Sequence, residues 1–266
     1  MLFLQTTFIF SILSIVNCNN ESWMVLFSLK LLVSPQNTSE AVECVNGEAD
    51  IIDVKNPAEG SLGANFPWII REIRNIVPDH IPLSATLGDV PYKPGTVALA
   101  ALGAAHAGAA YIKVGLFGTK TVTEAIEVMS AVTKTVVEYQ LPVSVVAAGY
   151  AEGDEIGCIN TSFIPEIAHK SSSDFAMIDT YNKENGKTIF DILSIEDLKL
   201  FIKNSRKWKL GSALGGSITL AHIPILKKLK PDIVGIRGAV CDNNDRIKGE
   251  IRSHLILEFN KKLKDL

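Results

Sequence analysis

The chain has 266 residues, of which 26 are Lys or Arg and 29 are Asp or Glu, so its formal net charge is −3. With 47% hydrophobic and 21% charged residues, the composition is that of a globular protein and excludes a disordered chain. The charge balance also argues against nucleic acid as a partner, because nucleic-acid-binding proteins are usually strongly basic. The four cysteines are far apart without a CxxC pair, and the five histidines are scattered. This spacing predicts neither a disulfide scaffold nor a zinc site, and no metal cluster can be read from it locally.

The first 16 residues carry no charge and are strongly apolar. This stretch is long enough for the core of a signal peptide but short for a membrane span of ~20 residues, and it lacks a basic start. It is equally compatible with targeting and with a non-essential leader. We therefore expect residues 1–23 to be a leader or extension and residues 24–266 to form one catalytic domain, cytoplasmic and not inserted in a membrane.

From Lys30 onward, short β-branched runs alternate with longer helical patterns such as 67–77, 121–140 and 194–207, which indicates parallel βα units. The predicted strands span residues 30–35, 49–56, 82–89, 109–116, 142–150, 174–180, 208–216 and 232–239. Eight such units match the size of a single (β/α)8 TIM barrel. An open, doubly wound sheet uses the same alternation and is the main alternative, but the chain has no GxGxxG turn, which favours the closed barrel.

Alternate residues of a strand share a face, and this places five charged side chains inside the predicted barrel. Each lies near the carboxyl end of its strand, where barrel enzymes build their active sites. An alternative is a salt-bridge network that only fills the mouth of the barrel, which is less favoured for charges that reach one rim from separate strands. The predicted inward set is Asp53, Lys55, Lys113, Asp179 and Arg237.

The two interior lysines indicate covalent chemistry with carbonyl compounds. Burial and a second nearby ammonium group both lower the pKa of a lysine, and a neutral amine can attack an aldehyde to form an imine. Asp53 lies two residues from Lys55 on the same face and is a candidate for proton transfer or for holding the iminium charge. Its negative charge would oppose the fall in the pKa of Lys55.

The loops after the last two strands indicate a phosphorylated ligand. The residues Gly215, Gly216 and Ser217 close the seventh strand and leave backbone N–H groups for an anion. Arg237 and Gly238 close the eighth strand. Barrels often bind phosphate at these two loops, although a short glycine turn can also be a tight connection and nothing more.

Several strings resemble one known family. They are DIIDVKNPAEGSLGANFPW (50–68), SATLGDVPYKPGT (84–96), YIKVGL (111–116), VVAAGYA (145–151), AMIDT (176–180), GKTIFD (186–191), GSI (216–218) and DIVGIRGA (232–239). The chain from about Leu31 to its end resembles the (5-formylfuran-3-yl)methyl phosphate synthase family, also called 4-(hydroxymethyl)-2-furancarboxaldehyde-phosphate synthase. Residues 1–23 have no counterpart in it.

The resemblance implies a (β/α)8 barrel that condenses two molecules of glyceraldehyde 3-phosphate into a furan aldehyde phosphate, with loss of phosphate and water. It implies a carbon–oxygen lyase that needs no metal or cofactor, whose best known setting is methanofuran biosynthesis. It also implies Lys55 as the Schiff-base lysine, Lys113 as the proton-transferring lysine, and Asp53 and Asp179 as acidic site residues.

The resemblance further implies Lys183 as the residue that holds the second substrate. Because the segment 179–188 is one residue longer than the family pattern, Lys187 is an alternative for this role. Two other functions stay open, namely a class I aldolase-type enzyme on another phosphorylated sugar and a non-catalytic barrel that binds a phosphorylated metabolite. Assembly into a homo-oligomer also stays open.

Overall fold

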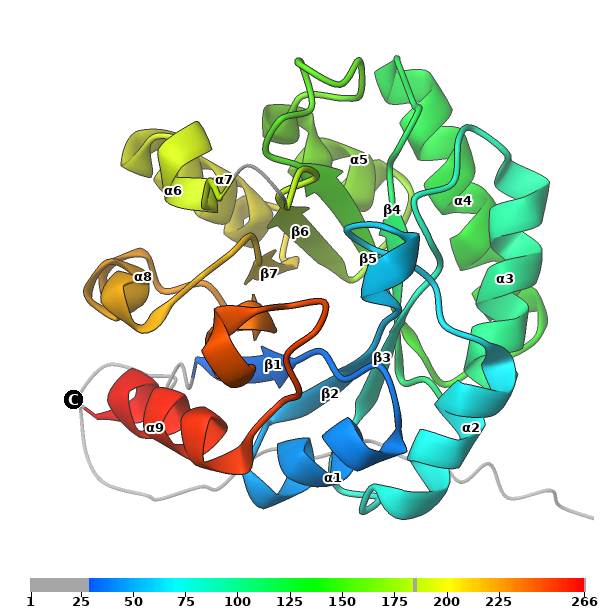
Figure 1. Cartoon of the computed structure of the whole chain (residues 1–266). Coiled ribbons are helices and arrows are strands. Elements are labelled where there is room, and N and C mark those ends of the chain that lie inside the picture. Colours follow the sequence, from blue (N-terminus) through cyan, green and yellow to red (C-terminus); the bar gives the residue numbers. More distant parts are fainter. Residues whose placement is uncertain (1–28, 184–185, 266) are drawn as a thin grey trace, which may run out of the picture.

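The computed structural model describes residues 29–183 and 186–265 of the chain (Figure 1). Parallel strands pair in chain order, and the last pairs with the first, so the sheet is a closed barrel. The strands are β1 (Lys30–Val33), β2 (Ile51–Val54), β3 (Leu83–Thr86), β4 (Tyr111–Gly115), β5 (Ser144–Tyr150), β6 (Phe175–Asp179), β7 (Gly211–Leu214) and β8 (Ile233–Ile236). The predicted (β/α)8 TIM barrel is confirmed, and the open sheet is excluded. The predicted leader, residues 1–23, lies outside the described residues.

Helices follow the strands and surround the barrel (Figure 1). They are α1 (Thr38–Asn46), α2 (Pro67–Ile76), α3 (Pro94–His106), α4 (Val122–Glu138), α5 (Ile164–Lys170), α6 (Ile189–Ile192), α7 (Ile195–Lys207), α8 (Ile223–Leu229) and α9 (Ser253–Lys264). Short 3₁₀ turns join them, namely η1 (Pro57–Glu59), η2 (Thr161–Phe163), η3 (Leu220–His222), η4 (Gly238–Val240) and η5 (Asp242–Asn244). Among the described residues, no helix has the length and apolar character needed to cross a membrane.

Local signals in the sequence explain where the helices begin. Pro67 occupies the first turn of α2, where its missing N–H costs no hydrogen bond. Ser194 caps α7 by accepting from the backbone N–H of Asp197, whose side chain accepts from the backbone N–H of Ser194, and this reciprocal pair is a capping box. The strands are shorter than predicted because the predicted ranges include residues of the adjoining loops, such as 34–35 after β1 and 208–210 before β7.

Alternation along the strands separates two apolar layers. Residues such as Ile52, Val54 and Ile112 pack outward against the helices in the main core. Ile51 and Met177 belong instead to a smaller cluster inside the barrel. Neighbouring residues of one strand thus lie in different layers, as alternation requires, and the interior cluster forms an apolar floor beneath the carboxyl ends of the strands.

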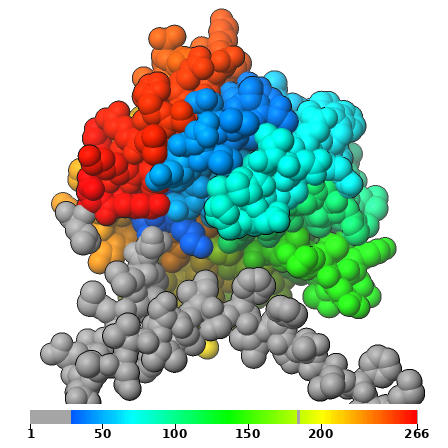
Figure 2. All heavy atoms as spheres, turned by 90° about the horizontal axis from the view of Figure 1, so that it is seen from below, coloured from blue at the N-terminus to red at the C-terminus, as the bar shows by residue number. Residues whose placement is uncertain are grey.

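The last helix closes the ring against the first. Seen from below, α9 lies directly beside α1 (Figure 2). The side-chain amide of Asn260 donates to the carbonyl of Glu48 at 2.7 Å, and Lys264 pairs with Asp50 at 2.9 Å. These contacts join the last helix to the connection between α1 and β2.

A tyrosine–aspartate pair closes one side of the barrel mouth. The hydroxyl of Tyr150, at the end of β5, donates to Asp89, which also accepts from the backbone N–H of Leu62 at 3.2 Å. The rings of Phe117 and Tyr181 pack against Tyr150. The open part of the mouth is therefore bordered mainly by β1 and by the loops after β6, β7 and β8.

Candidate active site

A cavity of ≈ 290 Å³ opens at the carboxyl ends of the strands. Small-molecule sites in barrels occupy this place and have about this size or a larger one. Except for Asp53, every site residue that the sequence predicts lines the cavity, and these are Lys55, Lys113, Asp179, Lys183, Gly215, Gly216, Ser217, Arg237 and Gly238. The fold thus brings together residues from five strands or the loops that follow them.

Asp53 lies behind Lys113, at the back of the cavity. The two residues form a buried ion pair with 2.6 Å between Lys113 Nζ and Asp53 Oδ2. The hydroxyl of Ser34, from the end of β1, donates to the same carboxylate oxygen at 2.9 Å. Within the described residues, Asp53 Oδ1 is buried and has no hydrogen-bond partner. The carboxylate therefore contacts Lys113 and Ser34 through one oxygen and keeps the other oxygen able to accept a hydrogen bond.

Lys55 and Lys183 share one carboxylate. Asp179, the last residue of β6, lies 3.8 Å from Lys55 Nζ and accepts a direct ion-paired hydrogen bond from Lys183. The side chain of Lys55 is only 7% exposed. Thr180 holds Asp179 and Lys183 in place, because its backbone N–H donates to Asp179 at 2.8 Å and its hydroxyl accepts from Lys183 at 2.7 Å.

Burial lowers the pKa of Lys55 to about 7, and the ammonium groups of Lys183 and Lys113 act in the same direction. The carboxylate of Asp179 opposes this shift but is shared with Lys183. Burial alone would raise the pKa of Asp179, yet the two lysines outweigh it and lower that pKa to about 2. Asp179 is thus a fixed anion, whereas Lys55 is partly a neutral amine near pH 7 and can act as a nucleophile.

We expect covalent capture of an aldehyde by Lys55 to depend on pH with an inflection near 7. Below that pH the amine is protonated in the folded protein and cannot attack, so the rate rises with pH and then levels off. The measurement is the initial rate of cyanoborohydride trapping of glyceraldehyde at Lys55 by mass spectrometry, divided by the rate for a model amine. Replacing Lys183 by Met removes a group that lowers this pKa and should move the inflection to higher pH. An inflection above pH 9 in the unmodified protein would contradict the expectation.

The turn after β7 has the backbone shape expected of an anion site. Gly216 has a φ of 108° and Ser217 a φ of 51°, so the chain turns sharply over the cavity. Among the described residues, the backbone N–H groups of Gly216, Ser217 and Ile218 have no hydrogen-bond acceptor. Gly215 lets the turn approach Asp179, since an added Cβ would lie 3.1 Å from the carboxyl carbon.

Arg237 lines the cavity, but its guanidinium is already occupied. It forms a buried, two-pronged ion pair with Glu40 of α1, with distances of 2.7 and 3.0 Å, and also donates to the carbonyl of Ser34 at 2.7 Å. The sequence predicts the position of Arg237 but not this partner. Its charge is therefore neutralised by the protein itself.

The two lysines proposed for the second substrate differ in position. Lys183 lines the cavity and is largely buried, whereas Lys187 is exposed and does not line it. The geometry therefore favours Lys183 for contact with a ligand.

Sequence reasoning missed three residues of this region, namely Ser34, Glu40 and Arg246. Ser34 directly follows β1 and could have been found by extending the alternation beyond the end of the strand. Glu40 and Arg246 come from a helix and a loop, where strand alternation gives no signal. Arg246 lines the cavity and is only partly exposed.

The described cysteines are all buried. Burial raises the pKa of Cys44 and that of Cys241, which disfavours the thiolate form. Cys18 lies outside the described residues. In the described part of the chain, no three His, Cys, Asp or Glu residues come together as a candidate metal site.

The fold and the cavity define a (β/α)8-barrel protein with a lysine-rich site at the carboxyl ends of its strands. The model of the 4-HFC-P synthase family matches residues 31–260, and the chain belongs to this family of enzymes. It is 55% identical to the (5-formylfuran-3-yl)methyl phosphate synthase of Methanococcus aeolicus, over 87% of this chain and 98% of that protein. It is 52% identical to the protein of the same name from Methanopyrus kandleri, over 88% and 98%.

Solved structures with the same architecture are more distant in sequence. The 3-hexulose-6-phosphate synthase of Salmonella typhimurium aligns with a TM-score of 0.62 and 18% identity, over 88% of this chain and 100% of that chain. The phosphoribosyl anthranilate isomerase of Thermus thermophilus aligns with a TM-score of 0.59 and 13% identity, over 88% and 98%. At such low identity these similarities show the fold alone.

Proposed function

We propose that the protein condenses two molecules of glyceraldehyde 3-phosphate to (5-formylfuran-3-yl)methyl phosphate through an imine at Lys55. The observation that carries this proposal is the buried Lys55 amine, whose pKa is about 7, in the cavity of a barrel of this family. The fraction of this amine that is neutral near pH 7 attacks the aldehyde carbon, and the carbonyl oxygen leaves as water. Asp179 lies close enough to stabilise the positive charge of the resulting iminium.

The iminium makes the hydrogen on the neighbouring carbon of the first triose acidic. Lys113 is the candidate for moving this proton, with Asp53 as its partner and Ser34 holding the carboxylate. Loss of the proton gives an enamine, whose electron pair expels phosphate from the third carbon. Proton transfer then leaves the imine of a three-carbon dicarbonyl compound, whose methyl carbon becomes the nucleophile after loss of another proton.

The structure of the product determines how the two trioses join. The formyl group and the two ring carbons next to it come from the first triose, so its third carbon bonds to the second carbon of the other triose. That second carbon must be a carbonyl carbon, so the second glyceraldehyde 3-phosphate reacts as its ketose isomer. The free hydroxyl of the second triose then adds to the second carbon of the first triose and closes the ring. Loss of two waters makes the ring a furan, and hydrolysis of the imine frees the formyl group from Lys55. The atoms balance with the net loss of one phosphate and two waters.

We expect the purified protein with glyceraldehyde 3-phosphate as its only substrate to form a conjugated furan aldehyde that absorbs in the near ultraviolet. The measurement is the mass and absorbance of the product together with inorganic phosphate, of which one should be released for each furan formed. A six-carbon product that keeps both phosphates would identify an aldolase-type enzyme instead. Failure to form a product or a trapped imine, in protein that still binds the triose, would identify a binding protein.

A further inference from the structure

Two arginines, Arg237 and Arg246, line the mouth of the cavity, and they differ in whether a described carboxylate pairs with the guanidinium. Arg237, which follows β8, is neutralised by Glu40 and uses its remaining donors on backbone carbonyls. One of these carbonyls is that of Arg246, which accepts from Arg237 Nε at 2.8 Å. Arg237 thus holds the loop that carries the second arginine.

Arg246 has a charged side chain that no described residue pairs with directly. Among residues 29–183 and 186–265, its guanidinium has neither an ion pair nor a hydrogen bond. Burial lowers the pKa of Arg246, with Arg237 contributing in the same direction and Asp179 opposing. A partly buried cation without a direct partner costs free energy, which indicates that its counter-charge comes from a ligand.

The loop around Arg246 is rigidly built. The side chain of Asp245 accepts from the backbone N–H groups of Ile247 and Lys248 at 2.9 and 3.0 Å. A β-bridge between Cys241 and Ile251 closes the base of the loop. Since backbone contacts fix both sides of Arg246, little of its freedom has to be lost when an anion binds.

The turn after β7 supplies a second set of donors to the same cavity. The backbone N–H groups of Gly216, Ser217 and Ile218 have no acceptor within the described residues. A guanidinium and several unpaired amides suit the three oxygens of a phosphate monoester, because arginine binds phosphate with two parallel hydrogen bonds.

We propose that Arg246, together with the 216–218 turn, binds the phosphate group of a triose substrate and selects phosphorylated over unphosphorylated aldehydes. Arg237 is a positioning residue for the loop of Arg246 and does not itself contact the ligand. The identity of the triose rests on the proposed function, whereas the phosphate site itself does not.

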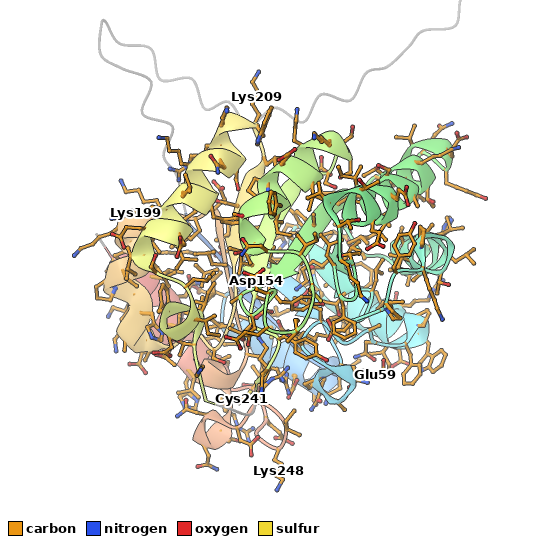
Figure 3. All side chains as sticks on the ribbon, turned by 90° about the horizontal axis from the view of Figure 1, so that it is seen from above. Glu59, Asp154, Lys199, Lys209, Cys241 and Lys248 are labelled. Carbon is orange, nitrogen blue, oxygen red and sulfur yellow. The ribbon has the colours of Figure 1, made fainter. Side chains whose placement is uncertain are left out.

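The test compares Arg246→Gln with Lys248→Gln, which removes a charge two residues away on the same loop. Lys248 is exposed, does not line the cavity and points away from the barrel (Figure 3). We expect Arg246→Gln to weaken binding of inorganic phosphate, measured by calorimetry, roughly 30- to 100-fold. It should lower kcat/KM for glyceraldehyde 3-phosphate by a similar factor, mainly through KM, and change trapping of glyceraldehyde at Lys55 far less. Lys248→Gln should leave all three quantities within about twofold of the unmodified protein.

A second variant keeps the inference testable if the Gln variant fails to fold. Arg246→Lys retains the charge without the planar fork, so its phosphate affinity should be intermediate. Unchanged phosphate affinity in either Arg246 variant, or no phosphate binding by the unmodified protein, would overturn the inference. If phosphate binds through Arg246 but no furan forms, the proposed function fails and the phosphate site stands.

Discussion

Replacing Lys55 by Met is expected to abolish furan formation and the borohydride-trapped adduct together. Without the amine no imine can form, so the electron sink for proton loss and phosphate loss is absent. The fall in turnover should reach roughly four orders of magnitude or more, as for the loss of other covalent nucleophiles. The measurements are the rate of product formation and the mass of the peptide that contains residue 55 after borohydride treatment with glyceraldehyde 3-phosphate.

The matched control is Lys199→Met, which removes an exposed lysine at the outer edge of α7 (Figure 3). This variant should keep both the activity and the adduct on Lys55. A Lys55→Met protein that retains a tenth of the activity, or an adduct that maps to another lysine, would refute the Schiff-base assignment.

The same substitution should stabilise the folded protein. At pH 7 and below, the unfolded chain carries Lys55 as a fully solvated ammonium with a pKa of 10.5, whereas burial lowers its pKa to about 7 in the folded state. Holding the charge inside the barrel therefore costs a few kcal/mol, which Lys55→Met regains. Between pH 7 and 10.5 the unfolded state binds more protons, so the unmodified protein gains stability as pH rises and the advantage of the variant shrinks. Denaturant unfolding at pH 6.5 and pH 10 measures this convergence.

Replacing Lys113 by Met should lower turnover roughly 10²- to 10⁴-fold while the adduct on Lys55 still forms. The reason is that Lys113 is proposed to move protons after the imine has formed, whereas the imine needs only the Lys55 amine. Trapping should be measured at pH 9, because Lys113 helps to lower the pKa of Lys55 and its loss raises that pKa. Unchanged turnover would remove the proton-transfer role from Lys113.

A double variant keeps this experiment interpretable. Lys113→Met leaves the fully buried Asp53 carboxylate without its cation, a loss that destabilises proteins by roughly 3–5 kcal/mol. The variant Asp53→Asn with Lys113→Met removes both charges and should recover most of that stability, but not the turnover. Recovery of turnover along with stability would show that the lysine acts only by maintaining the fold.

The barrel and most of its charged interior could be predicted because they follow from a local rule. Strand alternation has a period of two residues, so Ile52 and Val54 on the helix side place Ile51 and Asp53 on the inner side. Lys55 lies one residue beyond the end of β2 and still follows this alternation. The sequence therefore predicted the residues that reach the cavity from the strands.

The partners of these residues could not be predicted in the same way, because they depend on distant parts of the chain meeting in space. Arg237 pairs with Glu40, which is 197 residues away in the sequence. Arg246 reaches the cavity from an irregular loop whose path is determined by turns around Asp245 and not by any periodic pattern. The sequence points to Arg237, directly after β8, and gives no signal for Arg246, whereas within the described residues Arg237 is paired with Glu40 and Arg246 has no ion pair.

The apolar floor beneath the lysines has a consequence for the order of events in the proposed reaction. Ile51, Met177 and their neighbours lie inside the barrel under the cavity, so substrates and released groups are expected to pass through the mouth at the carboxyl ends of the strands. Phosphate set free from the first triose must therefore depart past the same rim through which the second triose arrives. We therefore expect a fixed order, in which phosphate leaves before the second triose binds while the first triose fragment stays covalently attached to Lys55.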